Sequence, residues 1–139
     1  MYHCAVKMLR NAGFNHYEIS NAAKPGKECL HNLKYWNMQE YLGFGLSAHS
    51  YIDGKRTGED IPDPKGDFIF TKLRLVKGFE KSEYFEMFGV NFDDEFSDEY
   101  KKLLLEGLLK EEDNIVSFTD KGLDNTNPVM ERLLSCLSM

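Results

Sequence analysis

Residues 91–108, which read NFDDEFSDEYKKLLLEGL, carry the helical pattern that decides the fold of the second half of the chain. Their large apolar side chains recur at the 3.6-residue period of a helix, at Phe92, Phe96, Tyr100, Leu103, Leu104 and Leu108. Asn91 is a suitable N-cap, and the acidic residues of the first turn lie where the helix dipole favours negative charge. We therefore predict an amphipathic helix that starts after Asn91 and buries one face.

Two shorter helices are predicted before this one. Apolar side chains recur at helical spacing across residues 68–76 and again across residues 83–88, and a glycine follows each segment. Ahead of the first segment, residues 61–66 read IPDPKG, a combination typical of a linker or surface loop. We place this linker at residues 59–67, between a first domain at residues 1–58 and a second at residues 68–139.

A hairpin and a last helix are predicted after residue 108. Residues 110–117 read as two short strands around Asp113 and Asn114. Thr119 then caps a final helix, which Pro128 bends or interrupts. Three helices, a hairpin and a further helix are the order of a winged-helix domain, and this is the fold predicted for the second half.

DNA binding is the common use of winged helices, through the third helix, but the charge of this one argues against it. Residues 92–107 carry six acids and two lysines, a net charge of −4, and residues 111–113 are all acidic. Residues 66–139 together carry 16 acids against 9 bases, a net charge of −7. Because DNA affinity depends on cations that contact phosphates, we predict a structural or protein-contacting module with no nucleic-acid partner.

The first half of the chain predicts part of an α/β domain. Residues 2–12 form an amphipathic helix closed by Gly13, and residues 14–20 alternate like a strand. A helix followed by a strand is half of a βαβ unit, yet the neighbouring strands that a parallel sheet needs are missing. We therefore expect the tail of a larger α/β domain, followed by a hairpin over residues 47–57 that would place Ser47, His49 and Tyr51 on one strand face.

Composition sets the cellular context that we expect. Hydrophobic residues make up 42% of the 139 residues, which is too apolar for a disordered chain. No apolar run is long enough to span a bilayer, and no secretory signal precedes the first helix. The three cysteines, Cys4, Cys29 and Cys136, are an odd number at irregular spacing, which fits reduced thiols in the cytoplasm.

Two neighbouring segments concentrate the residues that carry chemistry. Residues 31–36 read HNLKYW and residues 43–50 read GFGLSAHS, which brings together two histidines, the single tryptophan and two glycines. One interpretation is packing, with Tyr35 and Trp36 in the core and Asn32 capping a turn. The other is a binding site, because neutral imidazole ligates iron and aromatic faces suit a planar macrocycle.

Nucleophilic catalysis is not predicted. His49 lies beside Ser47 and Ser50 in the sequence, which suggests a nucleophile and its base. No acidic residue that would orient the histidine and no oxyanion arrangement is visible. We therefore assign no catalytic residue to this chain.

The chain resembles a known family in three ordered motifs. These are YEISN at residues 17–21, HNLKYW at residues 31–36 and GFGLSAHSY at residues 43–51, with FTDKG at residues 118–122 in support. Together they resemble the C-terminal part of HemW-like radical SAM proteins, a group often labelled oxygen-independent coproporphyrinogen III oxidase-like. The resemblance implies an α+β fold, in which the last αβ unit and hairpin of a partial TIM-type radical SAM barrel precede a winged-helix-like C-terminal domain.

The resemblance also implies ligands. Members of this subgroup handle heme through the first motif, so the heme-binding candidates are His31, Asn32, Tyr35 and Trp36, with His31 as the ligand of the heme iron. The second motif would lie near S-adenosylmethionine, which gives Gly43, Gly45, His49 and Ser50 as candidates. Heme or another porphyrin is the implied ligand, and heme-accepting proteins are implied partners.

The chain departs from the family in one decisive respect. The CxxxCxxC motif that binds the [4Fe-4S] cluster is absent, and the three cysteines are too widely spaced to replace it. The cluster and S-adenosylmethionine would therefore belong to a full-length parent, and this chain alone is predicted to be inactive. We predict a fragment of a heme chaperone involved in heme binding and transfer. The alternative is a fragment of an oxygen-independent coproporphyrinogen III oxidase, which decarboxylates a porphyrinogen oxidatively with S-adenosylmethionine.

Overall fold

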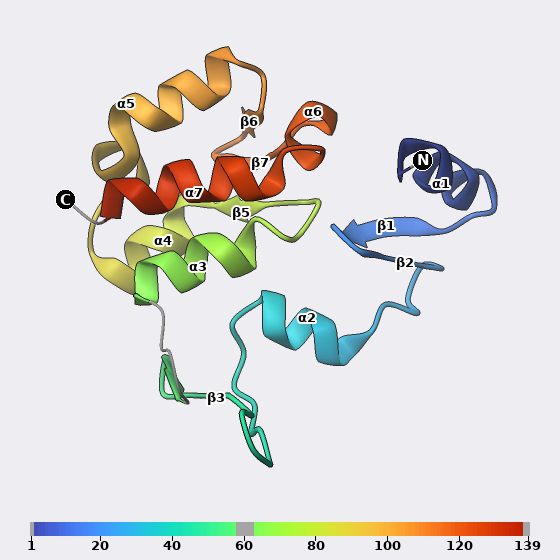
Figure 1. The fold of residues 1–139 in the computed structure, drawn as a ribbon, viewed down its shortest axis with the longest axis horizontal. Helices are drawn as coiled ribbons and strands as arrows, with labels where there is room; N and C mark the ends of the chain where they lie inside the picture. The colour runs from blue at the N-terminus through green and yellow to red at the C-terminus, as the bar shows by residue number, and fades with distance from the viewer. Residues whose placement is uncertain (1, 58–62, 138–139) are drawn as a thin grey trace.

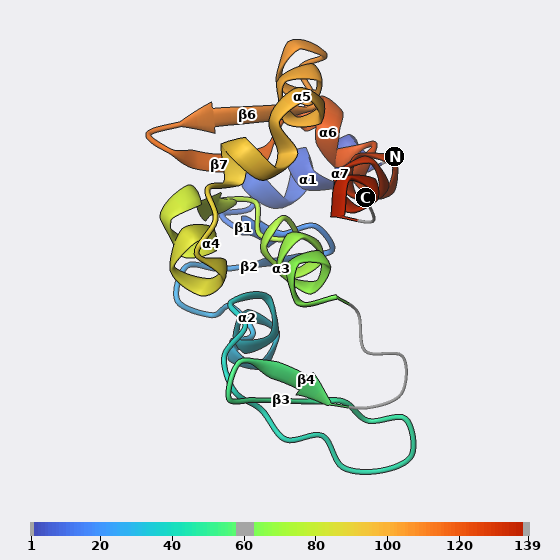
Figure 2. The ribbon, with the colours of Figure 1, turned by 90° about the vertical axis from the view of Figure 1, so that its left-hand side faces the viewer.

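The protein has a mixed fold of helices and short antiparallel sheets, as predicted, in a computed structural model that describes residues 2–57 and 63–137 (Figure 1). Its elements follow in the order α1 (Tyr2–Asn11), β1 (Asn15–Glu18), β2 (Asn21–Ala23), α2 (Leu30–Trp36), β3 (Ser50–Ile52), β4 (Lys55–Thr57), α3 (Pro64–Lys72), β5 (Phe79–Glu80), α4 (Lys81–Phe88), α5 (Phe92–Leu105), β6 (Leu109–Glu112), β7 (Ile115–Phe118), α6 (Asp120–Leu123) and α7 (Thr126–Leu137). Helices α3 to α7 gather around one sheet, with α1, β1 and β2 beside this body and α2 and the β3–β4 hairpin below it (Figures 1 and 2).

The sheet of the main body has three antiparallel strands in the order β5-β7-β6. The hairpin of β6 and β7 confirms the predicted one, and its two turn residues Asp113 and Asn114 both have positive φ, at 51° and 64°. Such a turn follows the natural twist of a two-stranded hairpin. Strand β5 was not predicted, because two residues carry no recognisable alternation of apolar and polar side chains.

The core of this body is aromatic. Phe68 is fully buried on α3, and its ring meets the rings of Phe79, Tyr84 and Phe88 edge-on, with centroids 5.0, 5.2 and 5.8 Å apart. Edge-to-face pairs of this kind add to the stabilisation that burial itself provides. The predicted apolar face of α5 joins the same cluster through Phe92, Phe96, Tyr100 and Leu103.

Two glycines allow the backbone to pass close to the sheet. A Cβ at Gly78, whose φ is +72°, would lie 1.9 Å from the carbonyl oxygen of Val116. A Cβ at Gly122, in α6, would lie 1.9 Å from the carbonyl oxygen of Leu108. No side chain fits at either distance, so glycine is required at both positions.

Two boundaries differ from the predictions. Helix α3 begins at Pro64, so residues 64–67 are helical and not a loop, while the rest of the predicted linker at residues 59–62 lies outside the described residues. The side chain of Asp63 accepts hydrogen bonds from the N–H groups of Lys65 and Gly66, which starts the helix there. The predicted last helix is divided into α6 and α7, and the break precedes Pro128, which lies within the first turn of α7.

The first part of the chain confirms the predicted helix as α1 and the predicted strand as β1. Strand β1 pairs antiparallel with β2, because the chain reverses at Ser20 and runs back along it. This pairing differs from the parallel neighbours expected of a barrel strand. The carboxylate of Glu18, which is fully buried, accepts hydrogen bonds from the N–H of Ser20 and the side chain of Asn21, and so holds the reversal.

The second hairpin also forms as predicted, with Asp53 and Gly54 at its turn. Its first strand begins only at Ser50, so the prediction that Ser47 and His49 share a strand face with Tyr51 is wrong. Ser47 has a φ of 62°, which no strand residue adopts.

Two carboxylates join buried tyrosines to the surface of the main body. The hydroxyl of Tyr84 donates to Glu95 at 2.7 Å, and that of Tyr100 donates to Glu111 at 2.8 Å. Each carboxylate also forms an ion pair with a lysine. Burial would raise the pKa of Glu95, but the hydrogen bonds from its lysine and Tyr84 outweigh it and lower that pKa. The lysine bonded to Glu111 lowers the pKa of that carboxyl as well.

These pKa values predict how stability changes in acid. A carboxyl group whose pKa is lower in the folded chain stabilises the fold above its unfolded pKa of about 4.3, and this contribution is lost as the pH falls through the folded value. We expect the free energy of unfolding in urea to drop progressively from about pH 5 downward, until the pH lies below the folded pKa values of these carboxyls. Glu95→Gln should reduce the drop, whereas Glu86→Gln on the exposed surface of α4 should not. Equal pH dependence in both variants would contradict this account.

Candidate functional site

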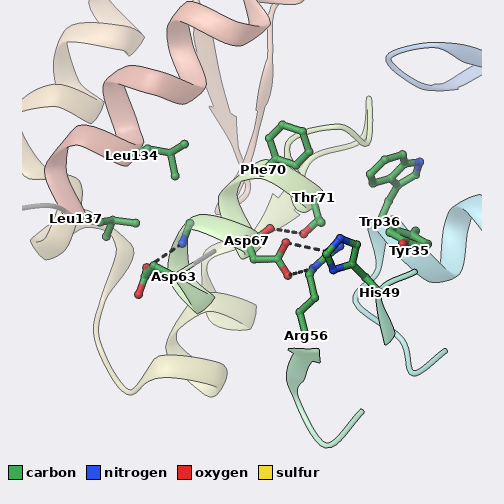
Figure 3. A pocket seen from close by; sticks show the side chains of 11 residues that line it. Tyr35, Trp36, His49, Arg56, Asp63, Asp67, Phe70, Thr71, Leu134 and Leu137 are labelled. Atoms are coloured by element: carbon green, nitrogen blue, oxygen red, sulfur yellow. Dashed lines mark hydrogen bonds and ion pairs between the residues drawn. The ribbon is translucent and has the colours of Figure 1, made fainter. Parts of the chain in front are cut away.

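A cavity of about 610 Å³ lies where α2 and the β3–β4 hairpin meet α3 and α7 (Figure 3). This volume is within the range of small-molecule sites. The lining residues come from four elements and two loops, and they are Tyr35, Trp36, His49, Arg56, Asp63, Gly66, Asp67, Phe70, Thr71, Leu134 and Leu137. The cavity is thus built by residues that are up to 102 positions apart in the sequence.

Helix α2 supplies the two aromatic side chains at its C-terminal end. The Tyr35 ring stacks on that of Tyr41, with centroids 4.2 Å apart and planes 22° apart. Tyr41 in turn stacks at 6.4 Å on buried Tyr51 of β3. Burial raises the pKa of Tyr41 well above its usual range, so its hydroxyl stays neutral. The tyrosine stack therefore attaches α2 to the hairpin.

An arginine on the hairpin also lies near the ring of Tyr35. Arg56 on β4 binds Asp67 on α3 through two contacts, Nη2 to Oδ1 at 2.8 Å and Nε to Oδ2 at 3.1 Å. Burial would lower the pKa of Arg56, but the bonds to Asp67 raise it, and the guanidinium stays charged. It also lies 5.5 Å from the centre of the Tyr35 ring. One ion pair thus joins the hairpin, α2 and α3.

A second arginine holds Trp36. The guanidinium of Arg74, which follows α3, lies 4.5 Å from the centre of the indole ring. The same side chain donates to Ser20 at 3.1 Å and pairs with Glu18 at 3.4 Å. Both aromatic residues of the motif therefore have a cation on one face, and each cation is anchored by a buried carboxylate.

The three cysteines do not fit an iron–sulfur cluster. Cys4 is exposed on α1, Cys29 is exposed before α2, and Cys136 is half-buried on α7. Within residues 2–57 and 63–137, no three His, Cys, Asp or Glu side chains are grouped so that they could hold a metal ion.

Comparison with known proteins finds similarity to HemN and HemW proteins. Residues 66–124 match the HemN C-terminal domain family. Heme chaperone HemW of Bacillus subtilis is 32% identical over 146 residues, which cover 88% of this chain and 38% of the relative. Heme chaperone HemW of Escherichia coli is 40% identical over 81 residues, which cover 58% of this chain and 19% of the relative. The chain is similar to heme chaperones HemW.

The HemW-like chain spans about two fifths of the curated relatives that it matches over most of its own length, 38% of the Bacillus subtilis protein and 41% of that from Lactococcus lactis. Among solved structures, it is similar to coproporphyrinogen III oxidase (HemN) from Escherichia coli, described as a radical SAM enzyme. The TM-score is 0.62 at 16% identity, over 94% of this chain and 39% of that chain, and this likeness is one of fold. No helix in the described ranges has the length and apolar character needed to cross a bilayer.

The first motif, HNLKYW at residues 31–36, has some residues at the cavity and others at the surface. Tyr35 and Trp36 line the cavity. His31 is exposed on the first turn of α2, where its ring centroid is 6.1 Å from that of Tyr35, and it is not a lining residue. Asn32 is half-buried and does not line the cavity either.

The second motif mainly folds upon itself. A Cβ at Gly43 would lie 2.2 Å from the carbonyl oxygen of His49, so the close approach expected at this glycine is made by the chain's own backbone. The N–H of Gly43 also donates to the hydroxyl of Ser50 at 2.9 Å. Gly45 has a φ of +113° at an exposed turn. Of the four residues singled out in this motif, only His49 lines the cavity.

The remaining lining residues were not predicted. Arg56, Asp67 and Phe70 belong to no recognisable motif, and Leu134 and Leu137 read as the apolar stripe of a helix. Tertiary contact alone brings them beside α2. A charge on a short strand and an acid within the first turn of a helix are too common to indicate a site.

Proposed function

We propose that this chain is the heme-handling part of a HemW-like heme chaperone, which binds heme and transfers it to an acceptor protein. One observation carries the proposal: α2 presents an exposed imidazole, His31, one turn before two aromatic side chains that line an apolar cavity. Neutral imidazole is a good iron ligand, and the rings of Tyr35 and Trp36 offer flat surfaces to a macrocycle. An exposed iron ligand also suits a chaperone, because the bound heme must be released to the acceptor protein.

Replacing His31 tests the proposal directly. In a heme titration of the full chain, we expect His31→Ala to remove the Soret shift of the bound iron and to weaken binding by about tenfold or more. His3→Ala is a matched control, because His3 is also an exposed histidine on a helix, paired with Asp124 on another face. Identical titrations of His31→Ala and the parent chain would overturn the assignment.

The finer features of the family form part of the same proposal. Residues 1–58 would complete one edge of a partial radical SAM barrel, and residues 68–139 would be a winged-helix-like domain. Gly43, Gly45, His49 and Ser50 would border the S-adenosylmethionine site of the full-length protein. Similarity to the HemW relatives supports this placement. A cytoplasmic location is supported by the free thiols of the three cysteines.

Porphyrinogen oxidation is the second candidate, and the likeness in fold to coproporphyrinogen III oxidase favours it. An anaerobic assay of the full-length protein with coproporphyrinogen III and S-adenosylmethionine separates the two functions. Formation of the decarboxylated product would identify an oxidase. Retention of heme without product formation would support the chaperone.

A further inference from the structure

Helix α2 has little packing of its own to fix its direction. It is seven residues long, and none of residues 30–36 is fully buried. A helix this short is marginal in water, so its position depends on contacts with the rest of the protein. Its aromatic contacts with other segments are made at the C-terminal end, by Tyr35 and Trp36, whereas His31 stands on the exposed first turn. The groups that hold this end of α2 therefore also set where His31 points.

The segment that follows α3 pairs with β1 through its backbone. The N–H of Ile19 donates to the carbonyl oxygen of Arg74 at 3.0 Å, and the N–H of Val76 donates to that of Tyr17 at 3.2 Å. These two bonds flank an antiparallel bridge between β1 and residue 75. Because they use only backbone atoms, they do not require any particular side chain at position 74. The Arg74 side chain is therefore not needed for this pairing.

That side chain reaches from the bridge to α2. Its guanidinium carbon lies 4.5 Å from the centre of the Trp36 indole ring. Its Nη2 lies 3.4 Å from a carboxylate oxygen of Glu18, which is fully buried, and donates to the hydroxyl of Ser20 at 3.1 Å. Glu18 is held in turn by the N–H of Ser20 and the side chain of Asn21. A guanidinium anchored by a buried carboxylate thus presents a flat cation to the indole at a defined place.

We propose that Arg74 is a positioning residue for α2: by holding Trp36, it fixes the helix and so the direction of His31. The proposal rests on the proposed function, in which His31 is the ligand of the heme iron. It also gives the C-terminal domain a role in heme binding, since Arg74 lies within residues 66–124, which match the HemN C-terminal domain family. Arg74 acts through Trp36 and need not touch heme.

Two variants at position 74 separate positioning from stability. Arg74→Lys keeps a cation for Glu18 but loses the flat guanidinium beside the indole, so it should unfold in urea nearly as the parent chain does. It should nevertheless shift the emission of Trp36, the only tryptophan, and raise its quenching by acrylamide. Arg74→Met loses the cation as well and should also lower stability. Lys77→Met, which removes an exposed cation from the same segment, is the matched control and should leave the Trp36 emission unchanged.

Heme binding by these variants tests the consequence for His31. In a titration of the full chain followed by absorbance, Arg74→Lys should bind heme about fivefold more weakly than the parent chain and show a smaller Soret shift. In a chain that carries Trp36→Leu, adding Arg74→Lys should weaken binding no further, because Arg74 acts through the indole. Additive losses would overturn the inference. So would a Trp36 emission and a Soret shift in Arg74→Lys that match those of the parent chain.

The outcomes separate this inference from the proposed function. A full Soret shift in Arg74→Lys, together with its loss in His31→Ala, would contradict the positioning role and keep His31 as the iron ligand. A heme spectrum indifferent to His31 would contradict the proposed function. The Trp36 emission of heme-free Arg74→Lys would then decide alone whether Arg74 holds α2: a shift would support it, and an unchanged emission would overturn it.

Discussion

Replacing Phe68 by alanine should lower the free energy of unfolding by about 4 kcal/mol. The ring is fully buried and lies edge-on to three other aromatic rings, so its removal loses both apolar burial and ring contacts and leaves a void. The surrounding rings come from α4 and β5, which limits how far they can relax into the space. Urea unfolding followed by circular dichroism measures the change.

Phe85→Ala is the matched control for this substitution. Phe85 lies on α4 beside Tyr84 but is 50% exposed, so its removal should cost less than about 1 kcal/mol. Comparable losses in the two variants would show that the aromatic cluster around Phe68 does not hold the main body together.

The second large effect is expected at Asp67. Asp67→Asn should lower stability by about 3 kcal/mol, because it leaves the largely buried guanidinium of Arg56 without its counter-charge. The same change should loosen Tyr35 and its neighbour Trp36 against α3. We therefore expect a shift in Trp36 emission and easier quenching by acrylamide, in addition to the lower unfolding free energy.

Two further variants isolate the cause. The double variant Arg56→Met/Asp67→Asn should recover part of the loss, since it removes the uncompensated charge. Glu112→Gln disrupts an exposed ion pair with Lys110 and should cost less than about 1 kcal/mol. A double variant that is less stable than Asp67→Asn alone would rule out the buried charge as the cause.

Local patterns predicted those parts of the fold that depend on neighbouring residues. The period of the apolar residues predicted α5. The pair Asp113 and Asn114 predicted the β6–β7 turn, and Thr119 predicted the start of a helix. The structure shows each of them, with the Thr119 hydroxyl accepting from the N–H of Gly122 at 3.0 Å. Each of these features depends on residues that lie close together in the sequence, so a local sequence pattern can predict it.

Features that depend on distant residues were not predictable in the same way. Strand β5 exists because it pairs with β7, whose residues lie more than 30 positions later in the chain. The start of α3 was missed for a different reason, because its local signals, the N-cap Asp63 and Pro64 at the first helical position, were interpreted as a loop. The candidate site shows the same limit: the motif named Tyr35 and Trp36, but only the folded chain places Arg56, Asp67 and His49 beside them.

The two histidines of these motifs, His31 and His49, show the same limit of sequence-based prediction for the functional site. Sequence resemblance placed His31 at the heme and His49 near S-adenosylmethionine. In the structure, His49 lines the cavity beside Trp36, while His31 stands on the exposed first turn of α2. The two imidazoles therefore have different surroundings, since His31 is exposed on α2 and His49 lines the cavity.

The tight passages at Gly78 and Gly122 limit how this sequence can diverge. At both positions even a methyl group would overlap a backbone carbonyl oxygen, that of Val116 in β7 or that of Leu108 just before β6. A homologue with the same strand order can accept almost no residue other than glycine at these two positions, although most of its surface residues can change. Glycine before β5, at position 78, and glycine after β7, at position 122, therefore identify this domain better than its overall sequence identity does. Sequence searches for distant homologues can give these two positions more weight than the other positions of the chain.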